Sequence, residues 1–197
     1  MLYYWDLIGV LLFGISGALA GRQKGMDFWG MFILALVTAV GGGTLRCMLI
    51  GDVPAFVLVD PTYVITAALS VAVAMLFPFL WDVFSREVSI LDALGLGIFV
   101  CIGTQTALDH HLAWWAAAGV GVITATFGGV IRDVLRNEVP LVFRKEIYAT
   151  AALGGALLMM SLKYLGLSEE WSIGVATFAT AGVRLLAIRY AVNQSST

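Results

Sequence analysis

Two short motifs place consecutive glycines three residues before an arginine, each inside a long apolar stretch. Consecutive glycines weaken a helix by about 1 kcal/mol each relative to alanine, so each motif predicts a kink or an unwound turn. Backbone carbonyl oxygens freed at such a turn can line a cation path. The arginines could cap helix ends, gate the path or hold lipid phosphate. The motifs read Gly41-Gly42-Gly43-Thr44-Leu45-Arg46 and Phe127-Gly128-Gly129-Val130-Ile131-Arg132, and Asp133 follows the second arginine.

The same glycines have a simpler interpretation, since small residues also let two helices pack closely in a membrane. Thr38 and Thr124 lie one turn before the glycines. Their hydroxyls either line a pore or bond back to a carbonyl of their own helix, as threonines in apolar helices commonly do. Both alternatives stay open for the threonines, and the doubled glycines with their arginines favour a pore.

The two motifs belong to a longer internal repeat, which a shift of the chain by 86 residues reveals without a gap. Each copy contains an odd number of predicted helices, so the second copy enters the membrane from the opposite side. Inverted repeats of this kind are common in transporters, where the path lies at the repeat interface. The identities between residues 6–54 and 92–140 pair Asp6 with Asp92, Gly9 with Gly95, Phe13 with Phe99, Gly17 with Gly103, Trp29 with Trp115, Thr38-Ala39 with Thr124-Ala125, Gly42-Gly43 with Gly128-Gly129, Arg46 with Arg132, Leu49 with Leu135 and Val53-Pro54 with Val139-Pro140.

The amino-acid composition indicates that the two motifs lie on membrane-spanning helices. Hydrophobic residues make up 60% of the 197 residues and charged residues 12%, against roughly half and a quarter in soluble domains. A spanning helix needs about 20 apolar residues. We therefore predict an all-α membrane protein with one membrane domain, divided into a first three-helix repeat (1–84), a second, inverted repeat (85–167) and a seventh helix with the tail (168–197). The predicted helices cover residues 2–21, 27–50, 62–81, 88–108, 112–135, 147–166 and 171–190.

Basic residues indicate the orientation of these helices, because lysine and arginine favour cytoplasmic loops. Arg22, Lys24, Arg86, Arg136, Arg144, Lys145 and Arg189 fall on one predicted side. The N-terminus is therefore expected outside and the C-terminus in the cytoplasm, in the inner membrane of a bacterium.

The sequence contains no pattern typical of nucleic-acid binding, catalysis or metal binding. The net charge of −2 gives no basic surface for nucleic acid. No HExxH motif, nucleophile elbow or Cys/His cluster occurs, so we expect no catalytic residue, no metal site and no cofactor. Asp6 and Asp92 are expected to cap the starts of their helices. Arg184 either reaches the headgroups or pairs inside the bundle.

With its seven helices, inverted repeat and GGGxxR/GGxxRD motifs, the sequence resembles the prokaryotic trimeric intracellular cation (TRIC) channels, which share a sequence family with UPF0126 proteins described as bacterial glycine transporters. The resemblance covers residues 1 to about 190. It implies a homotrimer in which each protomer conducts monovalent cations, chiefly potassium, past kinked second and fifth helices. Gly41, Gly42, Gly43 and Arg46 carry over to the first motif, and Gly128, Gly129, Arg132 and Asp133 to the second.

The residue after the first arginine departs from the family pattern. Cys47 stands where the bacterial pattern often has an acidic residue after the first arginine, so a paired carboxylate is not expected there. Relatives hold anionic lipid near these basic residues, which makes such a lipid a candidate partner. Secondary transport of a small solute such as glycine is the alternative function, because broken helices serve either activity.

Overall fold

The computed structural model describes residues 2–77, 88–144 and 147–194, and within these ranges every regular element is a helix. The predicted boundary at 84/85, Arg86, Lys145 and the last three residues of the tail lie outside the described residues. The helices are α1 (Leu2–Gln23), α2 (Phe28–Ile50), α3 (Phe56–Val59), α4 (Thr62–Leu76), α6 (Val88–Asp109), α7 (Trp114–Leu135), α8 (Leu141–Arg144), α9 (Ala149–Tyr164) and α10 (Glu169–Gln194).

Five of these helices, α1, α2, α6, α7 and α10, contain stretches long and apolar enough to cross a membrane. Helix α4 is apolar but has 15 described residues, and α9 has 16. Each predicted stretch coincides with one of these seven helices to within about four residues, apart from residues 78–81 of the third stretch, which are not described. The four-residue helices α3 and α8 were not predicted, because so short an element carries no periodic signal.

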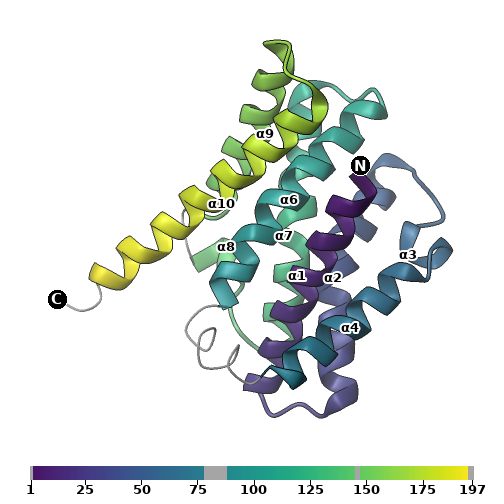
Figure 1. The fold of residues 1–197 in the computed structure, drawn as a ribbon, viewed down its shortest axis with the longest axis vertical. Helices are drawn as coiled ribbons and strands as arrows, with labels where there is room; N and C mark the ends of the chain where they lie inside the picture. Colours follow the sequence, from purple (N-terminus) through teal and green to yellow (C-terminus); the bar gives the residue numbers. More distant parts are fainter. Residues whose placement is uncertain (1, 78–87, 145–146, 195–197) are drawn as a thin grey trace.

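Helices α1, α2, α6 and α7 form the centre of the molecule, with α4 packed on one flank and α9 and α10 on the other (Figure 1). The extensive contacts within this centre join α6 to α7, α1 to α2, α2 to α7 and α1 to α6. The two motifs therefore lie on helices that touch each other, although they are far apart in the chain.

The centre is held by aromatic rings that sit against glycines. Phe13 of α1 and Phe99 of α6 meet edge to face, with their ring centroids 5.0 Å apart. A Cβ atom added to Gly9 would lie 2.9 Å from the Phe99 ring, and one added to Gly95 would clash with the Phe13 ring. Each ring thus fills the space left by a missing side chain, and the two contacts exchange under the 86-residue shift.

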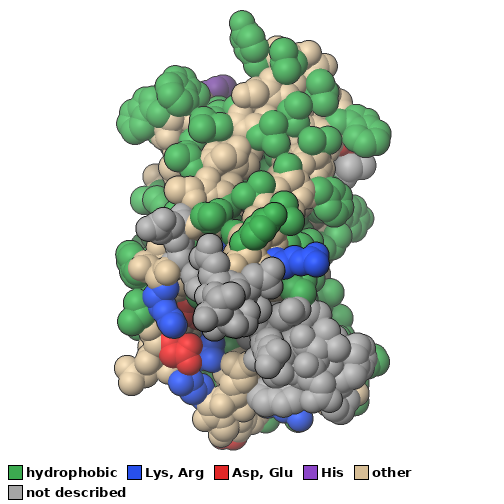
Figure 2. Space-filling model, turned by 90° about the vertical axis from the view of Figure 1, so that its left-hand side faces the viewer, with side chains coloured by type: hydrophobic (Ala, Val, Ile, Leu, Met, Phe, Trp, Pro, Cys, Tyr) green, Lys and Arg blue, Asp and Glu red, His purple; other side chains and the backbone are tan. Residues whose placement is uncertain are grey.

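The exterior of the bundle is largely apolar. Figure 2 shows hydrophobic side chains over the upper part of one face and lysine, arginine, aspartate and glutamate side chains in its lower half. Leu58, Ile65, Phe178 and Tyr190 are among the large apolar residues that are more than half exposed. Such a surface is stable against lipid, and the chain is a multi-pass membrane protein.

Candidate functional site at the crossing of α2 and α7

Helices α2 and α7 cross at the doubled glycines, with backbone against backbone. A Cβ atom on Gly42 would clash with the carbonyl oxygen of Thr124, and one on Gly128 would clash with the carbonyl oxygen of Thr38. The two contacts are reciprocal, because each joins the glycine of one motif to the threonine that precedes the other. No side chain larger than a hydrogen fits at either glycine in this arrangement.

The motifs predicted either a kink or an unwound turn, and the unwound turns are absent, while a kink that keeps the helical hydrogen bonds stays a prediction. Helix α2 is continuous through Gly41–Gly43, and α7 is continuous through Gly128 and Gly129. In a membrane, an unwound turn leaves backbone groups unpaired unless protein or water satisfies them. Here the neighbouring helix packs into the space beside the glycines, so the regular hydrogen bonds are kept.

The two threonine hydroxyls bond to their own helices. Thr38 Oγ1 donates to the carbonyl of Leu34 at 2.6 Å, and Thr124 Oγ1 donates to the carbonyl of Val120 at 2.7 Å. Both residues are buried. A Cβ on Gly17 would lie 2.8 Å from Thr38 Oγ1, and one on Gly103 would lie 2.6 Å from Thr124 Oγ1. These hydroxyls therefore also mark where α1 meets α2 and where α6 meets α7.

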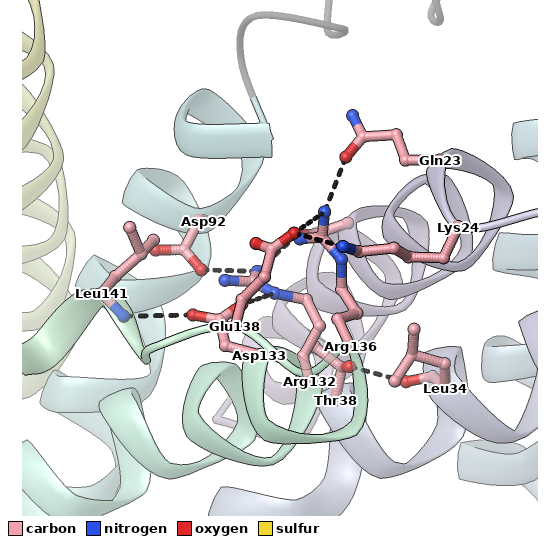
Figure 3. A network of polar contacts seen from close by, with 11 residues as sticks. Gln23, Lys24, Leu34, Thr38, Asp92, Arg132, Asp133, Arg136, Glu138 and Leu141 are labelled. Carbon is pink, nitrogen blue, oxygen red and sulfur yellow. Dashed lines mark hydrogen bonds and ion pairs between the residues drawn. The ribbon is translucent and has the colours of Figure 1, made fainter.

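Arg132, at the end of α7, is the centre of a buried ionic cluster (Figure 3). Its Nη1 donates to Asp92 Oδ1 at 2.9 Å and to Ser16 Oγ at 2.8 Å, and its Nε donates to Asp133 Oδ1 at 2.9 Å. Arg132 and Asp92 are 1% and 0% exposed. Charges so deeply buried are stable when they are paired and hydrogen-bonded, and this cluster ties α1, α6 and α7 together.

The cluster extends to the C-terminal helices. Asp133 Oδ2 accepts a hydrogen bond from the backbone N–H of Leu141, at the start of α8. A Cβ on Gly129 would lie 3.2 Å from the Tyr148 hydroxyl and 3.7 Å from Arg132 Nη2. Arg184 of α10 lies over the Tyr148 ring at 4.8 Å and is 3% exposed. Arg184 therefore packs inside the bundle rather than reaching the headgroups.

A second, more exposed network closes the same end of the molecule. Glu138 pairs with Lys24 at 2.9 Å and with Arg136 at 3.2 Å, and Arg136 Nη2 donates to Gln23 Oε1 at 2.9 Å (Figure 3). The hydrogen bond from Lys24 is the main cause that lowers the pKa of Glu138 below its usual value. The network joins the turn after α1 to the turn after α7.

Arg46, the counterpart of Arg132, has a different environment. It is 6% exposed, yet its Nε and Nη1 have no hydrogen-bond partner among the described residues. Its guanidinium carbon lies 5.7 Å from the centre of the Phe56 ring. The neighbouring position, occupied by Asp133 after Arg132, here holds Cys47, whose Sγ lies 4.0 Å from Asp52 Oδ2.

The two aspartates expected to cap helices do not do so. Asp6 and Asp92 are each the fifth residue of their helix and are buried, so they lie about one turn beyond the cap position, although both helices begin at the predicted residues. Asp6 Oδ2 accepts a hydrogen bond from the Tyr63 hydroxyl at 2.8 Å, and Asp92 accepts from Arg132. Sequence reasoning missed Asp92 as a partner of Arg132, although the presence of Asp and Arg in both copies of the repeat was a usable signal. Ser16 and Tyr148 gave no signal.

The family model described as glycine transporter matches residues 3–78 and again residues 89–164. The chain belongs to this family, which includes the TRIC channels and the UPF0126 proteins. The second match begins 86 residues after the first, the same offset as the internal repeat. A UPF0126 membrane protein of Vibrio cholerae is 39% identical over 96% of this chain and 80% of its own length. The UPF0126 inner membrane protein YadS of Escherichia coli is 38% identical over 96% of this chain and 93% of its own length.

Solved structures of TRIC channels share the fold. A TRIC trimeric intracellular cation channel orthologue from Rhodobacter sphaeroides superposes with a TM-score of 0.91 at 35% identity and covers 96% of this chain and 98% of its own. A prokaryotic TRIC channel superposes with a TM-score of 0.88 at 34% identity, over 97% of both chains. These neighbours are channels and not enzymes. The TRIC fold therefore extends over nearly the whole of this chain.

Proposed function

We propose that the protein is a passive channel for monovalent cations, chiefly potassium, with a pore inside each protomer of a homotrimer. The observation that carries the proposal is the close superposition on TRIC cation channels over nearly the full chain. Seven membrane spans in an inverted repeat are part of the proposal, which the double family match and the reciprocal glycine contacts support. The N-terminus is proposed to lie outside and the C-terminus in the cytoplasm of a bacterial inner membrane.

The proposed pore passes between α2 and α7, at the Gly42 and Gly128 contacts. Backbone carbonyls of Thr38 and Thr124 already lie at this crossing, and such oxygens can replace part of the hydration shell of a cation. Because the contacts exclude even a Cβ atom, the crossing is closed here, and conduction requires the two helices to separate. Gly41, Gly43 and Gly129 keep the surrounding surfaces small, while Arg46, Arg132 and Asp133 set the charge at the two ends and are candidates for gating or for holding anionic lipid.

Single-channel recording in planar bilayers tests the proposal. Purified protein in a gradient of potassium chloride is expected to give discrete openings whose reversal potential follows the potassium gradient. Replacing both Thr38 and Thr124 by valine keeps the side-chain volume at the crossing and removes two hydroxyls. We expect the conductance to change severalfold.

Thr106→Val is the matched control for the threonine pair. Thr106 also bonds back to its own helix, with Oγ1 donating to the carbonyl of Ile102 at 2.8 Å, but it lies away from the crossing and is expected to leave conductance unchanged. A silent bilayer together with saturable uptake of glycine into liposomes would contradict the channel and support a secondary transporter, which the description of the family model favours as the second candidate.

A further inference from the structure

The strongest unexplained feature is the pair of orphan N–H groups on Arg46. The side chain is almost fully buried, and neither Nε nor Nη1 has an acceptor among the described residues. A buried donor without a partner costs about 1–3 kcal/mol, and more when it belongs to a charged group. An acceptor from outside the chain would remove this cost.

The second motif indicates what kind of acceptor fits. Arg132 Nε, the atom that corresponds to one orphan, donates to the carboxylate of Asp133. Arg132 Nη1, which corresponds to the other, donates to Asp92 and Ser16. In the first motif, Cys47 replaces the adjacent carboxylate. Asp6, the counterpart of Asp92, is close enough to Arg46 for electrostatic attraction, but no ion pair joins them. Arg46 therefore has neither of the two carboxylate hydrogen bonds that its counterpart has.

We propose that Arg46 binds the carboxylate group of a small ligand, with the unpartnered Nε as a donor, at the end of the bundle where the N-terminus lies. The planar guanidinium fork matches a carboxylate. Phe56 covers the guanidinium from α3, a four-residue helix with no buried residue. The Phe56 ring also packs on Tyr63, with centroids 4.4 Å apart, while Leu58 and Val59 of α3 are exposed. A four-residue element held by so few contacts can move locally, and such a movement would admit the ligand. The site is separate from the crossing and does not depend on conduction.

The test uses the full chain in nanodiscs of neutral phosphatidylcholine, titrated with sodium acetate at constant ionic strength and followed by thermal unfolding. The unfolding temperature is expected to rise and saturate. Arg46→Gln should weaken acetate binding at least about tenfold, the equivalent of one charge-assisted hydrogen bond. Cys47→Asp should abolish binding, because it supplies the carboxylate that Asp133 supplies to Arg132.

Cys47→Ala is the matched control, since it removes the thiol without adding a carboxylate, and it should bind acetate as the native chain does. Glycine and inorganic phosphate complete the series. Tighter binding of glycine than of acetate would assign the carboxylate to an amino acid, and weaker binding would assign it to a simple acid; both support the site. Phosphate bound more tightly than either carboxylate, no saturable response to acetate, or a response that survives Arg46→Gln would overturn it.

Discussion

Arg132 and Arg46 occupy the same place in two matching stretches of chain, but the rest of the protein treats them differently. Arg132 is surrounded by two carboxylates and a serine hydroxyl, while Arg46 has an aromatic ring beside it and two N–H groups without acceptors. Asp6 and Ser16 lie ten residues apart on α1, or about 15 Å along its axis, so the two arginines lie toward opposite ends of the bundle. Arg132 is held by ion pairs, whereas Arg46 has buried donors without acceptors among the described residues.

This difference shows that the two copies of a duplicated motif can keep the same helix packing while the hydrogen-bond partners of their arginines differ. The glycines of both motifs make the same close contact with the opposite helix. The residue after each arginine differs, as do the partners supplied by α1. The largest energetic difference between the two ends should therefore come from charged residues, and the glycines should respond alike.

Replacing Asp92 or Asp6 by asparagine is expected to give the largest difference in stability between the two ends of the bundle. Asp92→Asn removes one of the two carboxylates that Arg132 contacts, and breaking a buried ion pair costs about 3–5 kcal/mol. Asp6→Asn keeps an acceptor for the Tyr63 hydroxyl and should cost less than about 1 kcal/mol. Unfolding in mixed micelles of increasing denaturing detergent, followed by circular dichroism, measures both. Equal losses of stability in the two variants would contradict the proposed difference between the environments of Arg132 and Arg46.

At the doubled glycines, by contrast, equal substitutions in the two motifs should cost similar amounts of stability. Gly42→Ala and Gly128→Ala each insert a methyl group against a backbone carbonyl, and overpacking of this kind costs about 1–3 kcal/mol. Gly119→Ala in α7 is the control, since no atom lies within 4 Å of its added Cβ and alanine favours a helix by up to about 1 kcal/mol. The same unfolding assay applies. A loss of stability in only one of the two variants would show that the two glycine contacts do not contribute equally to stability.

The smallest effect is expected from the exposed charges, at Glu138 and its counterpart Asp52. Glu138 has a lowered pKa in the folded protein, so its contribution to stability is present above the pKa of the unfolded chain and is lost as the pH falls through the folded pKa. For such a partly exposed pair, the contribution is at most about 1 kcal/mol.

Unfolding temperatures measured from neutral to acidic pH test this dependence. Glu138→Gln should remove part of the loss on acidification, whereas Asp52→Asn should leave the profile unchanged, because Asp52 forms no ion pair in the part of the chain that the structure describes. The hypothesis fails if the profile of Glu138→Gln coincides with that of the native chain.

Much of the fold could be read from the sequence, because the apolar stretches are long and their limits are set by charged and turn residues. The contact between the two motifs was also accessible, since equal residues at a fixed offset predict elements related by a symmetry axis. The local effect of Gly42 and Gly128 was not accessible. Glycine propensity predicts a break, but a neighbouring backbone that fits against the glycine preserves the helix, and that fit is a property of the packed pair.

The ionic cluster was the least predictable part. Asp92 was interpreted as a cap because aspartate favours helix starts, although four residues of α6 precede it and place it about one turn inside the helix, where it is buried. Ser16 lies 116 positions from Arg132 in the chain, and a single serine in an apolar helix gives no indication of such a partner. Long-range pairing of this kind depends on how the helices are packed.

The reciprocal contact between Gly42 and Gly128 also has a mechanical consequence. On each helix, the glycine that contacts the neighbouring carbonyl lies about one turn from the threonine whose carbonyl contacts the neighbouring glycine. Rotating or sliding α2 against α7 strains both contacts at once, because the two carbonyls belong to the same pair of helices. Both contacts therefore resist small movements together, and we expect α2 and α7 to separate in one concerted step rather than gradually.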